Sequence, residues 1–443
     1  MGGYVTDIVR RACAFAAVGS LALAAPIAGG AAAVVFLAIA VIAAFVVTDG
    51  PVFELFARPG DRKGNTLYGL AGVALAATGL ALLAMLPGFG LPLSVFVGTV
   101  LLLSYGNVGE QVVRSRTTSE IVATVGFGVV AFLGAVFGMV ATARLSGDPA
   151  RSAGEILFLA AAGALLAALL RSLLLERDDP LVMSSVGILL WFLADLTAPA
   201  PMEDVLGALA VTLALGYGSF ALGAASIPGM LTGVFLGLLT LVLGGPAWFV
   251  VLVTFFGVGA LATKYRYDQK VEHGVAQENE GARGSGNVLG NSAVALLALL
   301  GYAASPNPVD LPEAIFLYAF VGSLATALSD TLSSEIGGVY DDPRLITTLE
   351  VTEPGTDGAV TWQGVVAGTA GAAAVAAIAL LLYPAVEVVG AATVVAAGFV
   401  GMNADSIIGA TLEGDRLGNK SVNFLATLVG AVAAAGFAGL LGL

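Results

Sequence analysis

The sequence predicts an all-α protein whose helices cross a membrane about 15 times, within a range of about 12 to 15. Of its 443 residues, 58% are hydrophobic and 11% are charged, whereas about a quarter of the residues in a soluble domain are charged. The mean hydropathy is +0.96. Apolar runs close to the roughly 20 residues that a spanning helix needs recur along the whole chain.

The predicted spans are separated by short polar loops. They cover 12–26, 29–48, 66–86, 91–106, 120–142, 154–175, 181–197, 203–223, 228–243, 247–262, 288–303, 312–330, 361–383, 385–409 and 422–441. The first follows Arg10 and Arg11 and resembles a signal peptide. Because further apolar segments follow at once, a retained first helix is the favoured interpretation.

The basic residues predict the orientation. With the N terminus inside, alternation of the spans places 16 of the 18 Lys and Arg residues on one side, with Arg144 and Arg151 on the other. Lys and Arg collect on the cytoplasmic side of short loops. We therefore expect a multi-pass protein of the cell membrane, with the N terminus and the long polar loops in the cytoplasm.

Composition also excludes several kinds of site. A single cysteine, Cys13, excludes a disulfide framework, and a single histidine, His273, disfavours histidine metal clusters and a Ser-His-Asp triad. A metal would be bound by oxygen, which indicates Mg²⁺, Mn²⁺ or Ca²⁺. The net charge of −13 argues against a nucleic-acid partner.

Two carboxylates, Asp330 and Asp405, lie within predicted spans. A charged Asp at the centre of a spanning helix costs roughly 2.5–3.5 kcal/mol on insertion scales, so each needs a compensating role. Together they could bind a divalent ion that carries a nucleotide phosphate. The alternatives are a helix end that reaches water at Asp330, or buried polar groups bonded across helices.

Ser334 and Glu335 extend this polar stretch. Ser334 shares a helix face with Asp330, whereas Glu335 lies about 140° round the helix. Asp330 and Glu335 can therefore hold one cation together only if the helix turns or breaks near Ser333.

Two loops offer groups that suit phosphate. In the first, Lys264, Lys270 and Arg283 supply positive charge, and Asn287 and Asn291 follow near the start of the next span. The alternative is a loop that only fixes topology, with Asn287 as an N-cap.

The second loop follows Glu335 and carries a threonine pair, Thr347 and Thr348, and Gly-rich turns at Gly355 and Gly358. We expect it to form one wall of an active site that opens from the membrane to water. The soluble phosphate-loop pattern GxxxxGK[ST] is absent, so a soluble nucleotide-binding fold is not predicted.

From about Leu206 to the end the chain resembles a known family. The segments FFGVGALATKYRYDQK, GARGSGNVLGN, LSDTLSSEIG, VTEPGTDGAVTWQG and NADSIIGATLEGDRLGNKSVNFL are similar to the integral-membrane family that includes plant phytyl-phosphate kinase and many members of unassigned function. The resemblance implies CTP-dependent isoprenyl-phosphate kinase activity. It also implies functional roles for Lys264, Lys270, Arg283, Asn287, Asn291, Asp330, Ser334, Glu335, Thr347, Thr348, Gly355, Gly358 and Asp405.

The first half resembles other lipid enzymes less closely. The residues from Asp49 to Gly69 are similar to the pattern of dolichol and phytol kinases and of phosphatidate cytidylyltransferases. Asn65 stands where the pattern has Lys and Tyr68 where it has Glu, which argues against catalysis by this half. We therefore expect two lobes, 1–200 and 201–443, with the second as the working domain.

The expected function is phosphorylation of an isoprenyl alcohol or an isoprenyl monophosphate at the cytoplasmic face, with CTP or ATP as donor and Mg²⁺ (or Mn²⁺) as cofactor. The expected partners are this membrane lipid or isoprenoid and the nucleotide. A transporter or lipid scramblase is the alternative, since these also place polar residues within spans. A structural protein without a site is a third. The sequence leaves the particular lipid and the oligomeric state open.

Overall fold

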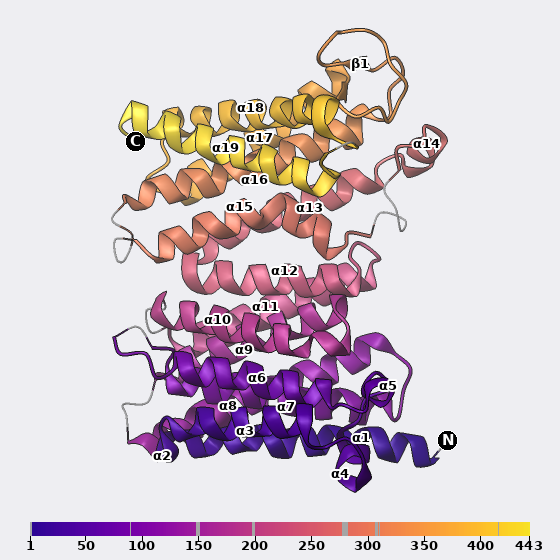
Figure 1. Ribbon diagram of the computed structural model, residues 1–443. Helices are drawn as coiled ribbons and strands as arrows, with labels where there is room; N and C mark the ends of the chain where they lie inside the picture. The colour runs from indigo at the N-terminus through magenta and orange to yellow at the C-terminus, as the bar shows by residue number, and fades with distance from the viewer. Residues whose placement is uncertain are drawn as a thin grey trace. The chain divides into compact units, whose positions relative to one another are not determined.

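The computed structural model describes residues 2–88, 90–147, 151–196, 200–276, 282–305, 309, 311–414 and 416–443, and its fold is helical (Figure 1). In these ranges 13 helices are long and apolar enough to cross a membrane, or 14 if one bent pair counts as a single span. The protein is a multi-pass membrane protein, and the all-α prediction is confirmed.

Each of the 15 predicted segments contains a helix, and two depart from a simple span. Segment 66–86 forms the shorter helix α6 (Tyr68–Leu83). Segment 29–48 forms α3 (Ala31–Phe45), after which the chain turns by 106° into α4 (Gly50–Phe56). Gly50 has φ +83°, which glycine adopts without strain, and Pro51 follows at the start of α4. Helix α3 ends at Phe45, short of the predicted residue 48, and the bend lies between Phe45 and Gly50.

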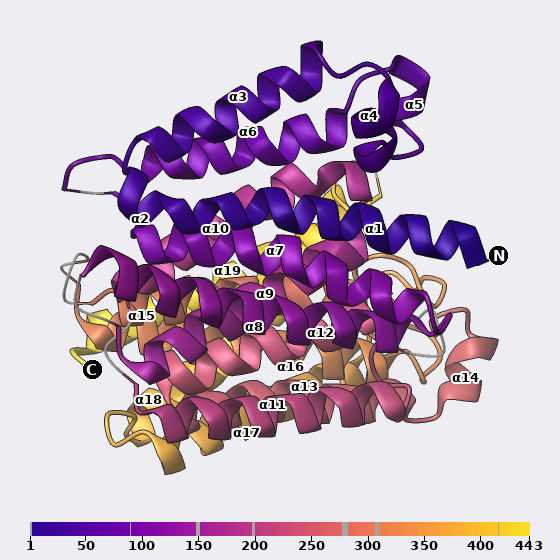
Figure 2. The same ribbon diagram turned by 90° about the horizontal axis from the view of Figure 1, so that it is seen from below.

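The chain divides into two compact units, Met1–Ala210 and Val211–Leu443. In the first, α3 and α6 lie side by side (Figure 2). Its elements are α1 (Gly2–Gly19), η1 (Ser20–Ala24), α2 (Ala25–Ala28), α3, α4, α5 (Asp61–Gly64), α6, α7 (Leu93–Arg114), α8 (Glu120–Ser146), α9 (Ala153–Leu173), η2 (Glu176–Asp178), α10 (Asp179–Leu196) and the start of α11 (Met202–Ala221).

The second unit contains the rest of α11 and a small antiparallel sheet in which Arg344 pairs with Val360. Its further elements are α12 (Ile227–Leu239), a π-helical turn η3 (Thr240–Gly244), α13 (Pro246–Lys264), α14 (Tyr267–Glu272), α15 (Ser285–Ala303), α16 (Glu313–Gly337), β1 (Arg344–Leu345), β2 (Ala359–Val360), α17 (Trp362–Leu382), α18 (Val388–Leu412) and α19 (Asn419–Leu441).

Helix α16 is the centre of the second unit and packs against α17, α18 and α19. Small residues bring these helices close. A Cβ added to Gly398 of α18 would lie 2.6 Å from Cβ of Ala372, and one added to Gly401 would lie 2.3 Å from Thr326. In a membrane the hydrophobic effect does not hold helices together, so close packing at small residues stabilises their association instead. They bring the polar parts of α16 and α18 together.

One end of the second unit carries all of its positive charge. Helices α13, α16 and α18 end there, and α15, α17 and α19 begin there (Figure 1). Helix α14 and the loop between α16 and α17, which carries β1 and β2 and is called the strand loop below, lie at the same end. All seven Lys and Arg residues beyond Val211 lie in or next to the loops of this end: Lys264, Arg266, Lys270, Arg283, Arg344, Arg416 and Lys420. This asymmetry is typical of a cytoplasmic face.

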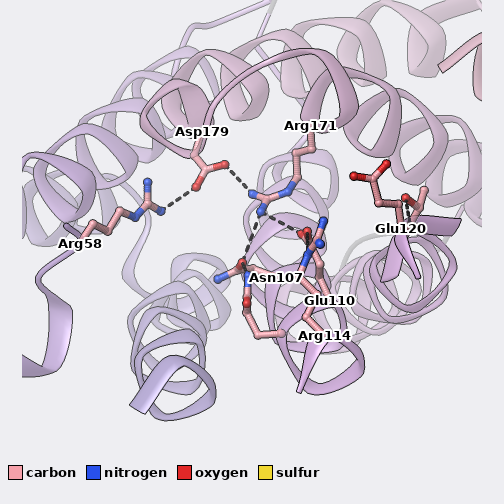
Figure 3. A network of polar contacts seen from close by, with 9 residues as sticks. Arg58, Asn107, Glu110, Arg114, Glu120, Arg171 and Asp179 are labelled. Carbon is pink, nitrogen blue, oxygen red and sulfur yellow. Dashed lines mark hydrogen bonds and ion pairs between the residues drawn. The ribbon is translucent and has the colours of Figure 1, made fainter. Parts of the chain in front are cut away.

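The first unit contains a network of ion pairs at the end of α7 and α9 (Figure 3). Asp179 of α10 accepts hydrogen bonds from Arg58 at 2.6 Å and from Arg171 of α9 at 2.5 Å. Arg171 also donates to Glu110 of α7 at 3.0 Å. These four side chains are 11–14% exposed. The network therefore cross-links the loop before α5 to three helices.

Candidate functional site

A cavity of about 280 Å³ lies at the positively charged end of the second unit. Its walls come from the last turns of α16 and α18, the first residue of α19, the loop between α16 and α17, and Val275 after α14. The lining residues are Val275, Asp330, Ser333, Ser334, Glu335, Gly337, Gly338, Tyr340, Pro343, Pro354, Gly355, Thr356, Asp357, Gly358, Ala359, Thr361, Asp405, Ser406, Gly409, Glu413 and Asn419.

Two carboxyl groups meet in this cavity. Asp330 of α16 and Asp405 of α18 lie within hydrogen-bonding reach of each other. Oδ1 of Asp405 is buried and has no hydrogen-bond partner among the described residues. Two carboxylates in contact repel each other unless a proton or a cation lies between them. The pair therefore forms an acceptor site that can hold a cation.

The roof of the cavity depends on two glycines in the left-handed region. Gly355 has φ +83° and Gly358 has φ +77°. A Cβ on Gly358 would lie 2.5 Å from the carbonyl oxygen of Ser406, so only glycine lets the loop approach α18 this closely. Thr361 then caps α17 by accepting a hydrogen bond from the Gly364 amide at 3.1 Å. The loop is thus fixed at both helices.

Glu335 lines the cavity but is turned toward α13. Because α16 continues unbroken to Gly337, Glu335 and Asp330 face different directions. The Glu335 carboxylate accepts hydrogen bonds from Nζ of Lys270 at 2.6 Å and from Oγ1 of Thr263 at 3.1 Å. Both of its oxygen atoms are therefore engaged by the protein.

Lys270 and Arg283 lie behind Glu335, outside the cavity lining. Lys270 is 1% exposed and also donates to the carbonyl oxygens of Ala262 and Thr263 at the end of α13. Arg283 is 6% exposed, and burial lowers the pKa of its guanidinium, an effect that nearby Glu335 partly offsets. Both cations are part of the protein interior.

The other predicted phosphate ligands lie apart from the cavity. Lys264 is exposed and donates to the carbonyl oxygen of Leu222 at 3.2 Å. Asn291 is buried and donates to the Asn287 carbonyl at 3.0 Å and to its side chain at 3.1 Å. Thr347 and Thr348 are exposed in the strand loop. Of the residues predicted for the site, the cavity brings together Asp330, Ser334, Glu335, Gly355, Gly358 and Asp405.

Several further polar residues that were not predicted as site residues also line the cavity, among them Tyr340, Asp357, Glu413 and Asn419. Burial and the charge of Asp357 raise the pKa of Glu413 above its usual range, while a hydrogen bond with Asn419 opposes this. All four lie in loops or at helix ends, where polar residues are ordinary. They come together at the cavity because the loop between α16 and α17 packs onto α18, a tertiary contact that the sequence does not show. Asp415, in one of the segments that carry the family resemblance, and the stretch from Glu278 to Gly281 lie outside the described residues.

The carboxyl pair suits a particular kind of metal binding. Among the described residues, no group of three or more His, Cys, Asp or Glu side chains is placed to hold a metal ion. Mg²⁺, however, is commonly bound by one or two carboxylates, with waters and substrate phosphates completing its shell. Asp330 and Asp405, with the unpartnered Oδ1 of Asp405, fit that mode.

The second unit matches known proteins. The family model for the integral membrane protein DUF92 matches residues 210–431. An uncharacterised membrane protein of Methanocaldococcus jannaschii is 34% identical over 210 residues, which cover 46% of this chain and 82% of that protein. One of Synechocystis is 38% identical over 199 residues, covering 44% of this chain and 74% of that protein.

A plant relative is also similar. The chloroplast protein VTE6 of Arabidopsis thaliana is 32% identical over 199 residues, which cover 45% of this chain and 59% of that protein. No solved structure matches the chain. The matched family segment, 210–431, covers most of the second unit, Val211–Leu443, and contains all the residues that line the cavity. The chain belongs to the DUF92 family of integral membrane proteins.

Proposed function

We propose that the protein is a membrane-embedded phosphotransferase that transfers a phosphate group from CTP or ATP to an isoprenyl alcohol or isoprenyl monophosphate. The observation that carries this proposal is the contact between Asp330 and Asp405 in a cavity at one end of a helical bundle. The similarity of the second unit to the family that includes plant phytyl-phosphate kinase supports the isoprenoid acceptor.

In this proposal Asp330 and Asp405 hold Mg²⁺ or Mn²⁺, and the metal supplies positive charge to the phosphates of the nucleotide. Phosphoryl transfer needs little covalent chemistry from the protein and depends on positioning and charge stabilisation. Residues of the loop from Gly338 to Thr361 line the cavity together with the carboxyl pair, so this loop would border the bound nucleotide.

The remaining lining residues have supporting roles. Gly355 and Gly358 expose backbone to the nucleotide, and Ser334, whose hydroxyl donates to the Asp330 carbonyl at 3.1 Å, completes the wall. Lys264, Thr347 and Thr348 lie outside the cavity lining and stay predicted phosphate ligands. The positively charged end would be cytoplasmic, so that nucleotide enters from the cytoplasm and the apolar tail of the acceptor remains in the membrane.

The test is an assay of the purified protein in detergent with CTP or ATP, MgCl₂, and a panel of prenyl alcohols and prenyl monophosphates. We expect a phosphorylated lipid whose formation stops when EDTA removes the metal. If no acceptor is phosphorylated with either nucleotide while the protein is folded, the proposal is wrong. Lipid exchange or solute flux in protein-containing vesicles without nucleotide turnover would instead favour a scramblase or transporter.

A further inference from the structure

A second hollow, the outer groove, adjoins the cavity at the same end of the second unit. Asp357 and Glu413 line both, so the two spaces share a wall. Ligand pockets usually measure about 300–1,000 Å³, and the cavity of about 280 Å³ falls short of that range. A ligand of substrate size in the cavity would therefore extend into the outer groove. The groove has a volume of about 500 Å³ and is lined by Asp357, Glu413, Gly414, Arg416, Leu417 and Gly418.

The shared wall is acidic. The cavity lining includes the carboxylates of Asp330, Glu335, Asp357, Asp405 and Glu413. Among the described residues that line either space, only Arg416 is a Lys or Arg. Lys270 compensates Glu335, and in the proposed function a metal compensates Asp330 and Asp405. Asp357 and Glu413 remain, and their charge would repel a phosphate at the shared wall. A polyphosphate that extends past them needs a fixed cation, which Arg416 can supply.

Arg416 lies on a hydrogen-bonded turn between α18 and α19. Its amide donates to the Leu412 carbonyl at 3.2 Å, and the Leu417 amide donates to the same carbonyl at 3.0 Å. Gly414, with φ +82°, donates from its amide to the Leu417 carbonyl at 3.0 Å. The side chain of Arg416 is exposed, and a Cβ added to Gly418 of the same groove would meet no atom within 4 Å. The turn therefore fixes the backbone of Arg416 and leaves its guanidinium accessible to a ligand in the groove.

We propose that the outer groove is the outer half of the nucleotide site, where Arg416 binds a phosphate group of the nucleotide. The inference rests on the proposed function, in which Asp330 and Asp405 hold the metal and the reacting phosphates in the cavity. All six residues that line the groove lie in loops beyond the helix ends, which suits a water-soluble nucleotide, whereas the tail of a phosphorylated lipid remains in the membrane. Arginine suits this role because its planar fork matches phosphate oxygens.

Two substitutions of Arg416 separate its charge from its shape. Arg416→Gln removes the charge and keeps a long polar side chain, whereas Arg416→Lys keeps the charge and removes the planar fork. Because the side chain is exposed, both variants should fold like the wild type. Arg266→Gln is the matched control, since Arg266 is an exposed arginine at the same end of the unit that lines neither the cavity nor the groove.

The measurement is the shift of the thermal unfolding midpoint of the full chain in detergent with MgCl₂ and increasing ligand. CTP and ATP represent the nucleotide, and a prenyl monophosphate in mixed micelles represents the lipid phosphate. We expect Arg416→Gln to raise the apparent Kd of the nucleotide by about tenfold or more, and Arg416→Lys to raise it by a smaller factor. Arg266→Gln should leave it unchanged, and binding of the prenyl monophosphate should be the same in all variants.

The readout separates this inference from the proposed function, because binding requires no turnover. If Arg416→Gln weakens nucleotide binding as expected but the wild type phosphorylates no acceptor, the Arg416 site stands and the kinase proposal falls. If the wild type is an active kinase and Arg416→Gln binds CTP and ATP as Arg266→Gln does, the Arg416 site is wrong and the kinase proposal stands. A loss confined to the prenyl monophosphate, or the absence of any nucleotide-dependent shift in the wild-type protein, would also overturn the Arg416 site.

Discussion

Lys270 donates a hydrogen bond of 2.6 Å from Nζ to Oε2 of Glu335, and these side chains are 1% and 4% exposed. The pair joins α14 to α16 directly behind the cavity. Because Lys270 also donates to two carbonyl groups at the end of α13, one ammonium group fixes three helices. Glu335 is thereby held in the cavity wall with its carboxylate turned away from Asp330.

The first prediction concerns the stability that this pair provides. Lys270→Met should lower the free energy of unfolding by about 3–5 kcal/mol, because it leaves the Glu335 carboxylate buried without its cation. The double variant Lys270→Met/Glu335→Leu should recover much of the loss, since it buries no unpaired charge. Unfolding of the purified protein in detergent measures both, and a double-mutant cycle isolates the pair.

Lys264→Met is the control, since Lys264 is exposed, and it should change stability little. If Lys270→Met unfolds like the wild type, the buried pair does not hold the three helices together.

A second prediction follows from Glu413 at the mouth of the cavity. Burial and the charge of Asp357 raise its pKa, so the folded protein binds this proton more tightly than the unfolded chain does. The stability from this proton is fully present below the ordinary glutamate pKa of 4.5 and is lost as pH rises through the raised value. Thermal midpoints measured from about pH 4 to about pH 7 should therefore fall less steeply in Glu413→Gln than in the wild type.

Glu350→Gln, at an exposed position of the strand loop, should keep the pH dependence of the wild type. Identical profiles for Glu413→Gln and the wild type would show that Glu413 does not titrate differently in the folded state.

The third prediction concerns orientation. In a protein whose exposed Cys13 is changed to Ser, single cysteines at Thr356 and Ser421 should react with a membrane-impermeant maleimide only from the cytoplasmic side. A cysteine at Ala385, in the exposed loop between α17 and α18, should react only from the other side. Labelling of Thr356→Cys from outside intact cells would reverse the orientation and place the cavity away from cytoplasmic nucleotide.

Much of the fold follows from the sequence because hydropathy alone decides which segments lie in a membrane. The 106° bend between α3 and α4 was harder to foresee, because hydropathy gives the extent of an apolar segment and not the direction in which the chain leaves it. Asp330 and Asp405 stand out in the sequence because charge within a span is expensive, and the structure places them together.

Side-chain directions were less predictable. The direction of Glu335 depends on whether α16 breaks near Ser333, and the helix continues unbroken to Gly337. The partners of Glu335, Lys270 and Thr263, lie in another part of the chain, so the sequence does not pair them with it. Asp357 and Glu413 lie in segments that carry the family resemblance, but neither was predicted as a site residue, because charged residues outside a span are ordinary. Their place in the cavity results from the loop turn at Gly358, which is a tertiary contact.

The central claim is that Asp330 and Asp405 together hold the metal that activates a nucleotide, and the most direct measurement is Mg²⁺-dependent turnover in Asp330→Asn and Asp405→Asn. Each variant keeps the shape of the side chain and removes its charge, so we expect each to lose nearly all turnover while remaining folded in detergent. Asp342→Asn is the matched control, because Asp342 is exposed, lies outside the cavity lining, and has a φ of +55° that Asn also tolerates. Turnover near the wild-type rate in either cavity variant would contradict the claim.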